Sequence, residues 1–234
     1  MILLTGASQG IGFACAKALL ERTPSEVMIT GRSEARLRSA RDGVPASCRE
    51  RLLLRVCDQA SASDVAALTV MLRDPRTALT GAILGVGVNP MYREGPQRLH
   101  RLAASTIDDT VRTNCTHTLL ITAGILERLR KQAGGVLLWI GSQAPKAGLA
   151  GAALYCATKS FLSGLARAAR NEYAGRGVRV QLLNPALVRT PRTVGVVDEF
   201  AAAHGLRVAE AEEIGNRIVD AYLSSDPGAA EVDL

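Results

Sequence analysis

The sequence predicts an α/β domain in which about seven parallel strands form one doubly wound sheet with helices on both faces. Three observations predict this fold. Short apolar segments of β type alternate with helix-length segments along the chain. A glycine-rich turn joins the first strand to the first helix. The length of 234 residues suits one well-buried core, so we expect residues 1–234 to form a single domain.

Strands are expected where short segments rich in Val, Ile and Leu lie between turn residues. Such runs suit a parallel sheet whose two faces are both covered by helices. In chain order the expected strands are Ile2 to Thr5, Glu26 to Thr30, Arg51 to Cys57, Gly81 to Gly87, Gly135 to Ile140, Val178 to Leu183 and Ala230 to Leu234. Their alternation with helical segments indicates βαβ units throughout.

Helices are expected in the longer segments between these strands. In chain order they are Gly10 to Glu21, Ser33 to Arg41, Ala62 to Arg73, Ala104 to Lys131, Ala152 to Ala174 and Glu210 to Ser224. The two long ones carry apolar residues at helical spacing, such as Ile121, Ile125 and Leu129 in the first. Each can cover the sheet and still offer a face to another subunit. We therefore expect a homodimer or homotetramer formed through these two helices.

The segment from Thr190 to Val208 has the least regular pattern in the chain. It follows a strand end, and open parallel sheets bind their ligands at the carboxyl ends of the strands. We therefore expect residues 190–208 to form the substrate-binding segment.

Composition narrows the classes of partner. The formal net charge of +6 can attract nucleic acid, an anionic cofactor or an acidic protein. The arginines are spread along the chain, and three Phe and one Trp offer few platforms for stacking bases, so we expect no nucleic-acid partner. No apolar run has the length of a membrane span, so we expect no membrane association.

The five cysteines form no C-x-x-C pair, and none of the three histidines falls at ligand spacing, so no metal site is expected. The pattern favours free thiols. The N-terminus lacks the basic and long apolar regions of a signal peptide. Together these features predict a cytoplasmic protein.

The turn after the first predicted strand reads Thr5-Gly6-Ala7-Ser8-Gln9-Gly10-Ile11-Gly12. Glycine is needed there because a Cβ would block the tight bend and the approach of a pyrophosphate to the backbone. Free N–H groups and the dipole at the start of the helix then stabilise the phosphates. The turn predicts a dinucleotide site; the alternative is a glycine-rich turn that binds nothing.

The end of the second predicted strand is expected to face the adenosine ribose of such a cofactor. An acidic side chain there selects NAD, whereas an arginine favours the 2′-phosphate of NADP. Arg32 is present and no acid is, so the sequence predicts NADP(H) in preference to NAD(H). The alternative is a solvated arginine at the start of the helix.

Tyr155 and Lys159 form a Y-x-x-x-K pair in a predicted helix, so their side chains share one face. A nearby ammonium stabilises a phenolate, and we expect it to lower the tyrosine pKa from its usual value of about 10. The pair could then act as a general acid/base. Alone it is poor evidence, because such pairs are common on helix surfaces.

Three further motifs accompany this pair. They are Ile140-Gly141-Ser142, with the serine 13 positions before Tyr155; Arg112-Thr113-Asn114 in the preceding long helix; and Asn184-Pro185-Ala186-Leu187-Val188-Arg189-Thr190 after the sixth strand. With the glycine turn, these five motifs in this order resemble the classical short-chain dehydrogenase/reductase (SDR) family from Ile2 to about Asp226. They are most similar to the 3-oxoacyl carrier-protein reductases of that family. The resemblance implies a Rossmann-type fold.

The resemblance also implies a role for each catalytic residue. Ser142 would hydrogen-bond the substrate carbonyl, and Tyr155 would pass a proton to its oxygen. Lys159 would bind the nicotinamide ribose and tune Tyr155, and Asn114 would hold a water that relays protons to Lys159. The implied cofactor-binding residues are Gly6, Ser8, Gln9, Gly10, Ile11, Gly12, Arg32, Cys57, Asp58, Gly85, Gly87, Tyr155, Lys159, Pro185, Val188 and Thr190, of which Asp58 would contact the adenine.

Two departures from the family pattern lie beside this site. The N-N-A-G stretch after the fourth strand is replaced by Leu84-Gly85-Val86-Gly87, so both asparagine side chains are missing. Those asparagines tie the central strand to the cofactor loop, and their loss puts cofactor affinity in doubt. Ala186 replaces the glycine of the Pro-Gly pair.

Several functions remain open within this frame. The predicted reaction is NADP(H)-dependent reduction of a ketone, or oxidation of a secondary alcohol, on a small-molecule substrate that is either free or bound to a carrier protein. The resemblance implies that Arg176 stands at a basic position used to dock an acidic carrier, and Arg130 and Lys131 lie on the adjoining helix. The alternative, given equal weight, is that these residues are solvated surface charges. A secondary-metabolite ketoreductase is a second enzyme hypothesis. A dinucleotide-sensing or scaffold protein without turnover is the alternative from another class.

Overall fold

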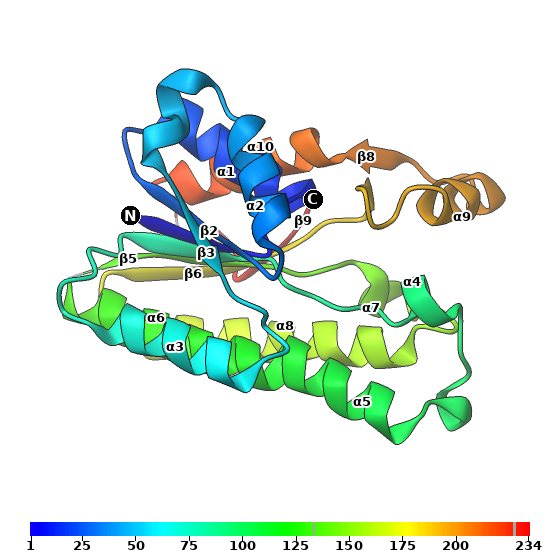
Figure 1. Ribbon diagram of the computed structural model, residues 1–234. Helices are drawn as coiled ribbons and strands as arrows, with labels where there is room; N and C mark the ends of the chain where they lie inside the picture. Colours follow the sequence, from blue (N-terminus) through cyan, green and yellow to red (C-terminus); the bar gives the residue numbers. More distant parts are fainter. Residues whose placement is uncertain (133, 227) are drawn as a thin grey trace.

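The computed structural model describes residues 1–132, 134–226 and 228–234. Its centre is a seven-stranded sheet in the order β3-β2-β1-β4-β5-β6-β9, with every pairing parallel (Figure 1). The strands are β1 (Ile2–Thr5), β2 (Val27–Gly31), β3 (Leu52–Val56), β4 (Gly81–Leu84), β5 (Gly135–Ile140), β6 (Val178–Asn184) and β9 (Glu231–Asp233). The predicted doubly wound parallel sheet is confirmed.

Helices cover both faces of the sheet, as Figure 1 shows. One face carries α1 (Gly10–Arg22), α2 (Glu34–Asp42) and α10 (Ala211–Leu223). The other carries α3 (Ala62–Arg73), α5 (Ala104–Val111), α6 (His117–Lys131) and α8 (Ala153–Tyr173). Helix α1 packs on α10, and α3 packs on α6.

The core consists of two apolar layers, one on each face of the sheet. Consecutive strand residues point to opposite faces. Leu4 therefore packs with the α1 and α10 layer, and Leu3 with the α3, α6 and α8 layer. Trp139 of β5 is fully buried in the second layer and donates from Nε1 to Thr122 Oγ1 at 3.2 Å. Burial on both faces explains why the strand sequences read as continuous apolar runs.

The strand order reverses between β1 and β4. The chain runs from β1 outward to β2 and β3, then returns so that β4 pairs with the other side of β1. The loops that follow β1 and β4 therefore diverge, which leaves a crevice at the carboxyl ends of these strands. Ligands of open α/β sheets bind at such a point, so the topology directs attention to this edge.

The predicted helix Ala104 to Lys131 is not one regular helix. Helix α5 ends at Val111, a π-helical turn spans Arg112–Thr116, and α6 begins at His117. π-Helical turns often mark functional positions, and this one carries Asn114. The predicted strand Gly81 to Gly87 was too long, because β4 ends at Leu84. Its neighbour β1 ends at Thr5, where Gly6 turns the chain away with φ 67.

Residues 190–208, where the sequence pattern is least regular, contain secondary structure that was not predicted. They contain α9 (Val196–His204), and β7 (Leu187–Arg189) pairs with β8 (Val208–Glu210) in a two-stranded parallel ribbon. Arg189 holds this unit together, since it pairs with Asp198 at 2.7 Å and with Glu210. Two short helices without a sequence prediction, α4 (Met91–Glu94) and α7 (Ala144–Ala147), lie near it at the same end of the sheet (Figure 1).

All five cysteines are free thiols. Within residues 1–132, 134–226 and 228–234, no helix is long and apolar enough to cross a membrane.

Candidate active site

The glycine-rich turn between β1 and α1 leaves almost no room for side chains. Gly6 and Gly10 have φ angles of 67° and 60°, in the left-handed region that favours glycine. A Cβ on Gly12 would lie 2.8 Å from the Gly6 carbonyl oxygen and 2.9 Å from Ala7 Cα. The turn is therefore closed on the protein side, and its backbone is accessible to a ligand.

The start of α1 has unpaired N–H groups beside this turn. Gln9 is the N-cap and its side chain makes no capping hydrogen bond, whereas Ser33 and Ser61 cap α2 and α3. An uncapped N-terminus that follows a glycine turn matches the donors and dipole that bind a pyrophosphate. Ile11 packs on the core beneath, and Ser8 lies 3.1 Å from the point where Gly31 would carry a Cβ. The residues present therefore fit a dinucleotide.

The ends of β2 and β3 form the next part of the crevice. Arg32 is exposed directly after β2. Cys57 is buried and its N–H donates to the Gly31 carbonyl oxygen at 3.0 Å, and desolvation raises the pKa of its thiol to about 11. Asp58 Oδ1 accepts from the Ala60 N–H at 3.0 Å. Arg32 and Asp58 are therefore at the edge where the sequence predicts the adenosine end of the cofactor.

The loop after β4 shows how the chain manages without the two family asparagines. The Gly85 N–H donates to the carbonyl oxygen and to Oγ1 of Thr5, both at 3.2 Å. A Cβ on Gly85 would lie 3.1 Å from both Ile140 Cδ1 and the Thr5 carbonyl oxygen. The Thr5 hydroxyl thus provides a polar tie between strand and loop. Gly87, two residues later, approaches Lys159, whose Nζ would be 3.1 Å from an added Cβ.

Asn114 joins three elements from the π-helical turn. It is 4% exposed, its Oδ1 accepts from the Val88 N–H at 2.8 Å, and its Nδ2 donates to the Val88 carbonyl oxygen at 2.8 Å. Nδ2 also donates to Thr158 Oγ1 at 3.0 Å. Both amide hydrogens are thus used, and they reach Val88 and Thr158 rather than Lys159. A water at this position would have to bind to a remaining acceptor lone pair.

Ser142 is positioned by a side chain from the neighbouring strand. Asn184, 3% exposed at the end of β6, accepts from the Ser142 N–H through Oδ1 at 3.1 Å. The close approach requires glycine at position 141, because a Cβ there would lie 2.0 Å from Asn184 Oδ1. Ser142 Oγ in turn accepts from the Ala144 N–H at 3.1 Å, which fixes the start of α7.

Tyr155 and Lys159 lie one turn apart in α8, as predicted, with Lys159 Nζ 5.8 Å from the Tyr155 ring centre. Desolvation raises the pKa of Tyr155 to about 12, although a hydrogen bond with Ser142 acts in the opposite direction. Desolvation lowers the pKa of Lys159 to about 8, and its Nζ donates to the Ile140 carbonyl oxygen at 2.8 Å. The expected lowering of the tyrosine pKa by Lys159 is therefore not observed, because desolvation outweighs the Ser142 hydrogen bond and the charge of Arg192.

The segment after β6 closes the crevice from the side of α1. The Pro185 carbonyl oxygen accepts from the Gln143 N–H at 3.0 Å, and Val188 is buried in β7. Thr190 lies against the glycine turn, since a Cβ on Gly10 would be 3.3 Å from its Cβ. Thr190 Oγ1 also lies 3.0 Å from Thr193 Oγ1.

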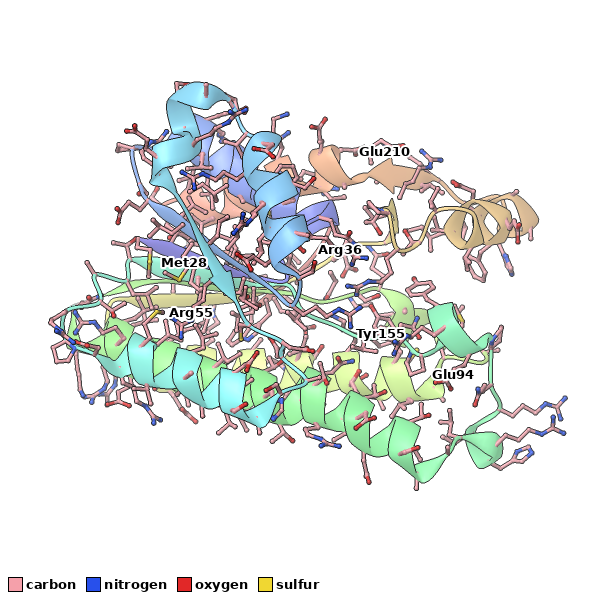
Figure 2. All side chains as sticks on the ribbon, viewed as in Figure 1. Met28, Arg36, Arg55, Glu94, Tyr155 and Glu210 are labelled. Carbon is pink, nitrogen blue, oxygen red and sulfur yellow. The ribbon has the colours of Figure 1, made fainter. Side chains whose placement is uncertain are left out.

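The structure thus brings the four predicted catalytic residues and the glycine turn to one end of the sheet. Sequence reasoning missed three supporting residues, which are Thr5, Thr158 and Asn184. Asn184 stood in a recognised motif and Thr158 lies between the two motif residues of α8, so both could have been considered. A small pocket opens beside Tyr155, lined among others by Asn89, Met91, Leu102, Gly151 and Leu154. Figure 2 shows Tyr155 at the same end of the molecule as Arg36 of α2.

The family model described as short chain dehydrogenase matches residues 1–199. The chain is 29% identical over 232 residues to the 3-oxoacyl-(acyl-carrier-protein) reductase FabG of Escherichia coli, covering 97% of this chain and 90% of that protein. It is 27% identical over 201 residues to carbonyl reductase family member 4 of Danio rerio, covering 86% and 81%.

Solved structures share the fold at lower identity. A 3-ketoacyl-(acyl-carrier-protein) reductase from Brucella melitensis, complexed with NADH, has a TM-score of 0.85 at 19% identity, with 100% of this chain and 95% of that chain covered. A short chain dehydrogenase from Burkholderia cenocepacia, in complex with NADP, has a TM-score of 0.85 at 22% identity, with 100% and 94% covered. With the glycine turn, the strand order and the match over residues 1–199, the chain belongs to the short-chain dehydrogenase family.

Proposed function

We propose that this chain is an NADP(H)-dependent ketoreductase in which Tyr155 is the general acid/base. The observation that carries the proposal is the juxtaposition of Tyr155 with Ser142, beside Lys159 and a small pocket. A protein that only bound the dinucleotide would have no need of this arrangement next to its cofactor turn. The substrate would be a ketone, or a secondary alcohol in the reverse direction.

The protonation states suit proton donation to a carbonyl oxygen. With a pKa of about 12, Tyr155 holds its proton at neutral pH until a stronger base forms. Ser142 would hold the substrate oxygen by a hydrogen bond and keep it within reach of the Tyr155 hydroxyl. Lys159 would bind the nicotinamide ribose, and Asn114 would fix the π-helical turn against the Val88 loop and support proton relay to Lys159.

For the cofactor, we propose that the glycine turn and the start of α1 bind the pyrophosphate, while Arg32 binds the 2′-phosphate of NADP(H). When bound, the dinucleotide supplies or accepts the hydride. The chain's own contribution is to hold the reacting atoms in place and keep Tyr155 protonated. Arg32 supports the preference for NADP(H), with a solvated arginine as the alternative. Residues 190–208, through α9 and the ribbon, would shape the substrate pocket.

The test is a panel of ketones and acyl thioesters assayed with NADPH and with NADH, read by the absorbance of the reduced cofactor. We expect faster oxidation of NADPH than of NADH with at least one ketone. Equal use of both cofactors would overturn the Arg32 assignment. Binding of NADPH without turnover across the whole panel would favour the dinucleotide-sensing alternative.

A 3-oxoacyl thioester on a carrier protein is the second candidate substrate, favoured by the similarity to FabG. The proposed docking cations, Arg130, Lys131 and Arg176, are exposed, and Lys131 pairs with Glu127 at 2.8 Å. Arg130 and Lys131 are the last two residues of α6, and Arg176 follows the end of α8, at the end of that helix opposite Tyr155. The 21-residue α8 alone spans about 30 Å. These cations could serve a catalytic site only on a partner subunit whose α8 runs in the opposite direction.

Self-association through α6 and α8 would provide such a partner, and we propose a homodimer or homotetramer on this face. Leu119 and Leu120 of α6 are 43% and 49% exposed. Helix α8 exposes the small residues Ala157, Ser160, Gly164 and Ala168, which allow close packing of helices. Sedimentation analysis would test this, and a monomer at micromolar concentration would contradict it.

A further inference from the structure

One arginine in the segment after β7 reaches across the crevice to the cofactor loop. Arg192 Nη1 donates to the carbonyl oxygen of Gly87 at 2.8 Å, a contact between residues 105 positions apart. Thr190, two residues earlier, packs against Gly10 of the glycine turn. This segment therefore contacts the glycine turn through Thr190 and the loop after β4 through the Arg192 guanidinium.

The position of Arg192 along the crevice follows from the charges that act on it. Desolvation lowers the pKa of Arg192, and repulsion from Arg32 lowers it further, whereas Tyr155 acts in the opposite direction. A weaker repulsion comes from Arg36. The guanidinium is thus close enough to sense Arg32, at the proposed adenosine end, and Tyr155, at the proposed nicotinamide end. The cofactor moiety between those two ends is the pyrophosphate.

No carboxylate of the described chain neutralises this group of cations. Arg32, Arg36 and Arg192 form no salt bridge among the described residues. Arg189, only three residues from Arg192, is by contrast paired with two carboxylates, Asp198 and Glu210. Like charges that approach one another in a partly desolvated crevice destabilise each other unless an anion binds between them.

We propose that Arg192 is a cofactor-binding residue whose guanidinium pairs with the pyrophosphate of the dinucleotide, opposite the glycine turn. This inference rests on the proposed dinucleotide cofactor. The start of α1 would hold the phosphates from one side through backbone N–H groups, and Arg192 would hold them from the other through a charge-assisted, forked contact. Because Arg192 belongs to the segment that carries α9, cofactor binding would also fix residues 190–204 over the crevice.

The experiment measures dissociation constants by calorimetry for NADPH, NADH, ADP and adenosine 2′-monophosphate with wild type, Arg192→Gln, Arg192→Lys and Arg32→Gln. ADP carries a diphosphate without the 2′-phosphate, and adenosine 2′-monophosphate carries the 2′-phosphate without any 5′-phosphate. We expect Arg192→Gln to weaken NADPH, NADH and ADP alike, about 10- to 100-fold, and to leave the 2′-monophosphate within about twofold. Arg192→Lys should fall between Arg192→Gln and wild type.

Two controls make the result specific. Arg32→Gln should weaken NADPH and the 2′-monophosphate but spare NADH and ADP, which is the opposite selectivity. Arg217→Gln removes an exposed charge of α10 and should change none of the four constants. Far-ultraviolet circular dichroism and thermal unfolding of each variant check that it is folded.

Several outcomes would overturn the proposal. If Arg192→Gln binds NADH and ADP as wild type does and loses only NADPH, the arginine recognises the 2′-phosphate instead. If all four constants are unchanged and only the KM of an anionic ketone rises, the arginine binds substrate. In both cases the proposed cofactor survives. If wild type itself binds neither dinucleotide, the proposed function fails and this inference fails with it.

Discussion

The contact between Gly141 and Asn184 makes the positioning of Ser142 directly testable. In Gly141→Ala the new Cβ would lie 2.0 Å from Asn184 Oδ1 and 2.9 Å from Leu182 Cδ1, both buried. The Asn184 amide would have to move, which breaks its 3.1 Å hydrogen bond with the Ser142 N–H. Overpacking costs about 1–3 kcal/mol, and an unsatisfied buried polar group costs about as much again. We therefore expect a loss of about 2–6 kcal/mol in the free energy of unfolding.

The assay is urea unfolding followed by circular dichroism, together with kcat/KM on the best substrate of the panel. Gly164→Ala, measured at a concentration where the protein is monomeric, is the matched control, because an added Cβ there meets no atom of the same chain within 4 Å. It should be neutral or stabilise the protein by up to about 1 kcal/mol. Gly141→Ala should also lose activity, because Ser142 would shift when its N–H loses the Asn184 acceptor.

A double-mutant cycle with Asn184→Ala isolates the contact. Removing the amide makes room for the new methyl group, so the cost of the double variant should fall short of the summed single costs by at least about 1 kcal/mol. If Gly141→Ala is as stable as Gly164→Ala, or the two costs add fully, the argument for Ser142 positioning is wrong.

Two further predictions concern buried polar groups. Lys159 has a pKa of about 8 in the folded protein and 10.5 as a free side chain. Between these pH values the unfolded chain therefore holds a proton on Lys159 that the folded chain has lost. Wild-type stability relative to Lys159→Met should therefore rise with pH over this window, on the order of 3 kcal/mol, and a flat difference in urea titrations would contradict it. Asn114→Ala removes the bonds to Val88 and Thr158 and should cost about 2–4 kcal/mol; a change below about 0.5 kcal/mol would show that the π-helical turn does not depend on it.

The sheet could be predicted because its determinants are local in the sequence. Strands buried on both faces read as apolar runs, and the glycine turn identifies the first βα unit. The irregularities were not predictable in this way. The π-helical turn at Asn114 depends on bonds to Val88 and Thr158, which are 26 and 44 residues away. The helical spacing of apolar residues continues through that turn, so the sequence pattern gives no sign of it.

The candidate site likewise has features that the sequence predicts and features that depend on the folded structure. The residues of the motifs could be named from their spacing, but their electrostatics could not. The pKa of Tyr155 depends on how far desolvation outweighs the Ser142 hydrogen bond and the charge of Arg192, which is a property of the packed structure. Likewise, the Thr5 hydroxyl can tie strand to loop in place of an asparagine only because Gly85, directly after the neighbouring strand β4, lies next to it in the fold. Arg192 belongs to no recognised sequence motif, and its contact with Gly87 exists only in the folded chain.

The most direct test of the central claim compares Tyr155→Phe with Tyr173→Phe at the other end of the same helix. Both variants lose one phenolic hydroxyl, and each is measured for the NADPH dissociation constant and for ketone reduction under single-turnover conditions. We expect Tyr155→Phe to bind NADPH within about twofold of wild type and to lose at least about 100-fold in the rate of reduction, while Tyr173→Phe keeps both. Reduction by Tyr155→Phe at the wild-type rate would contradict the assignment of this tyrosine as the proton donor.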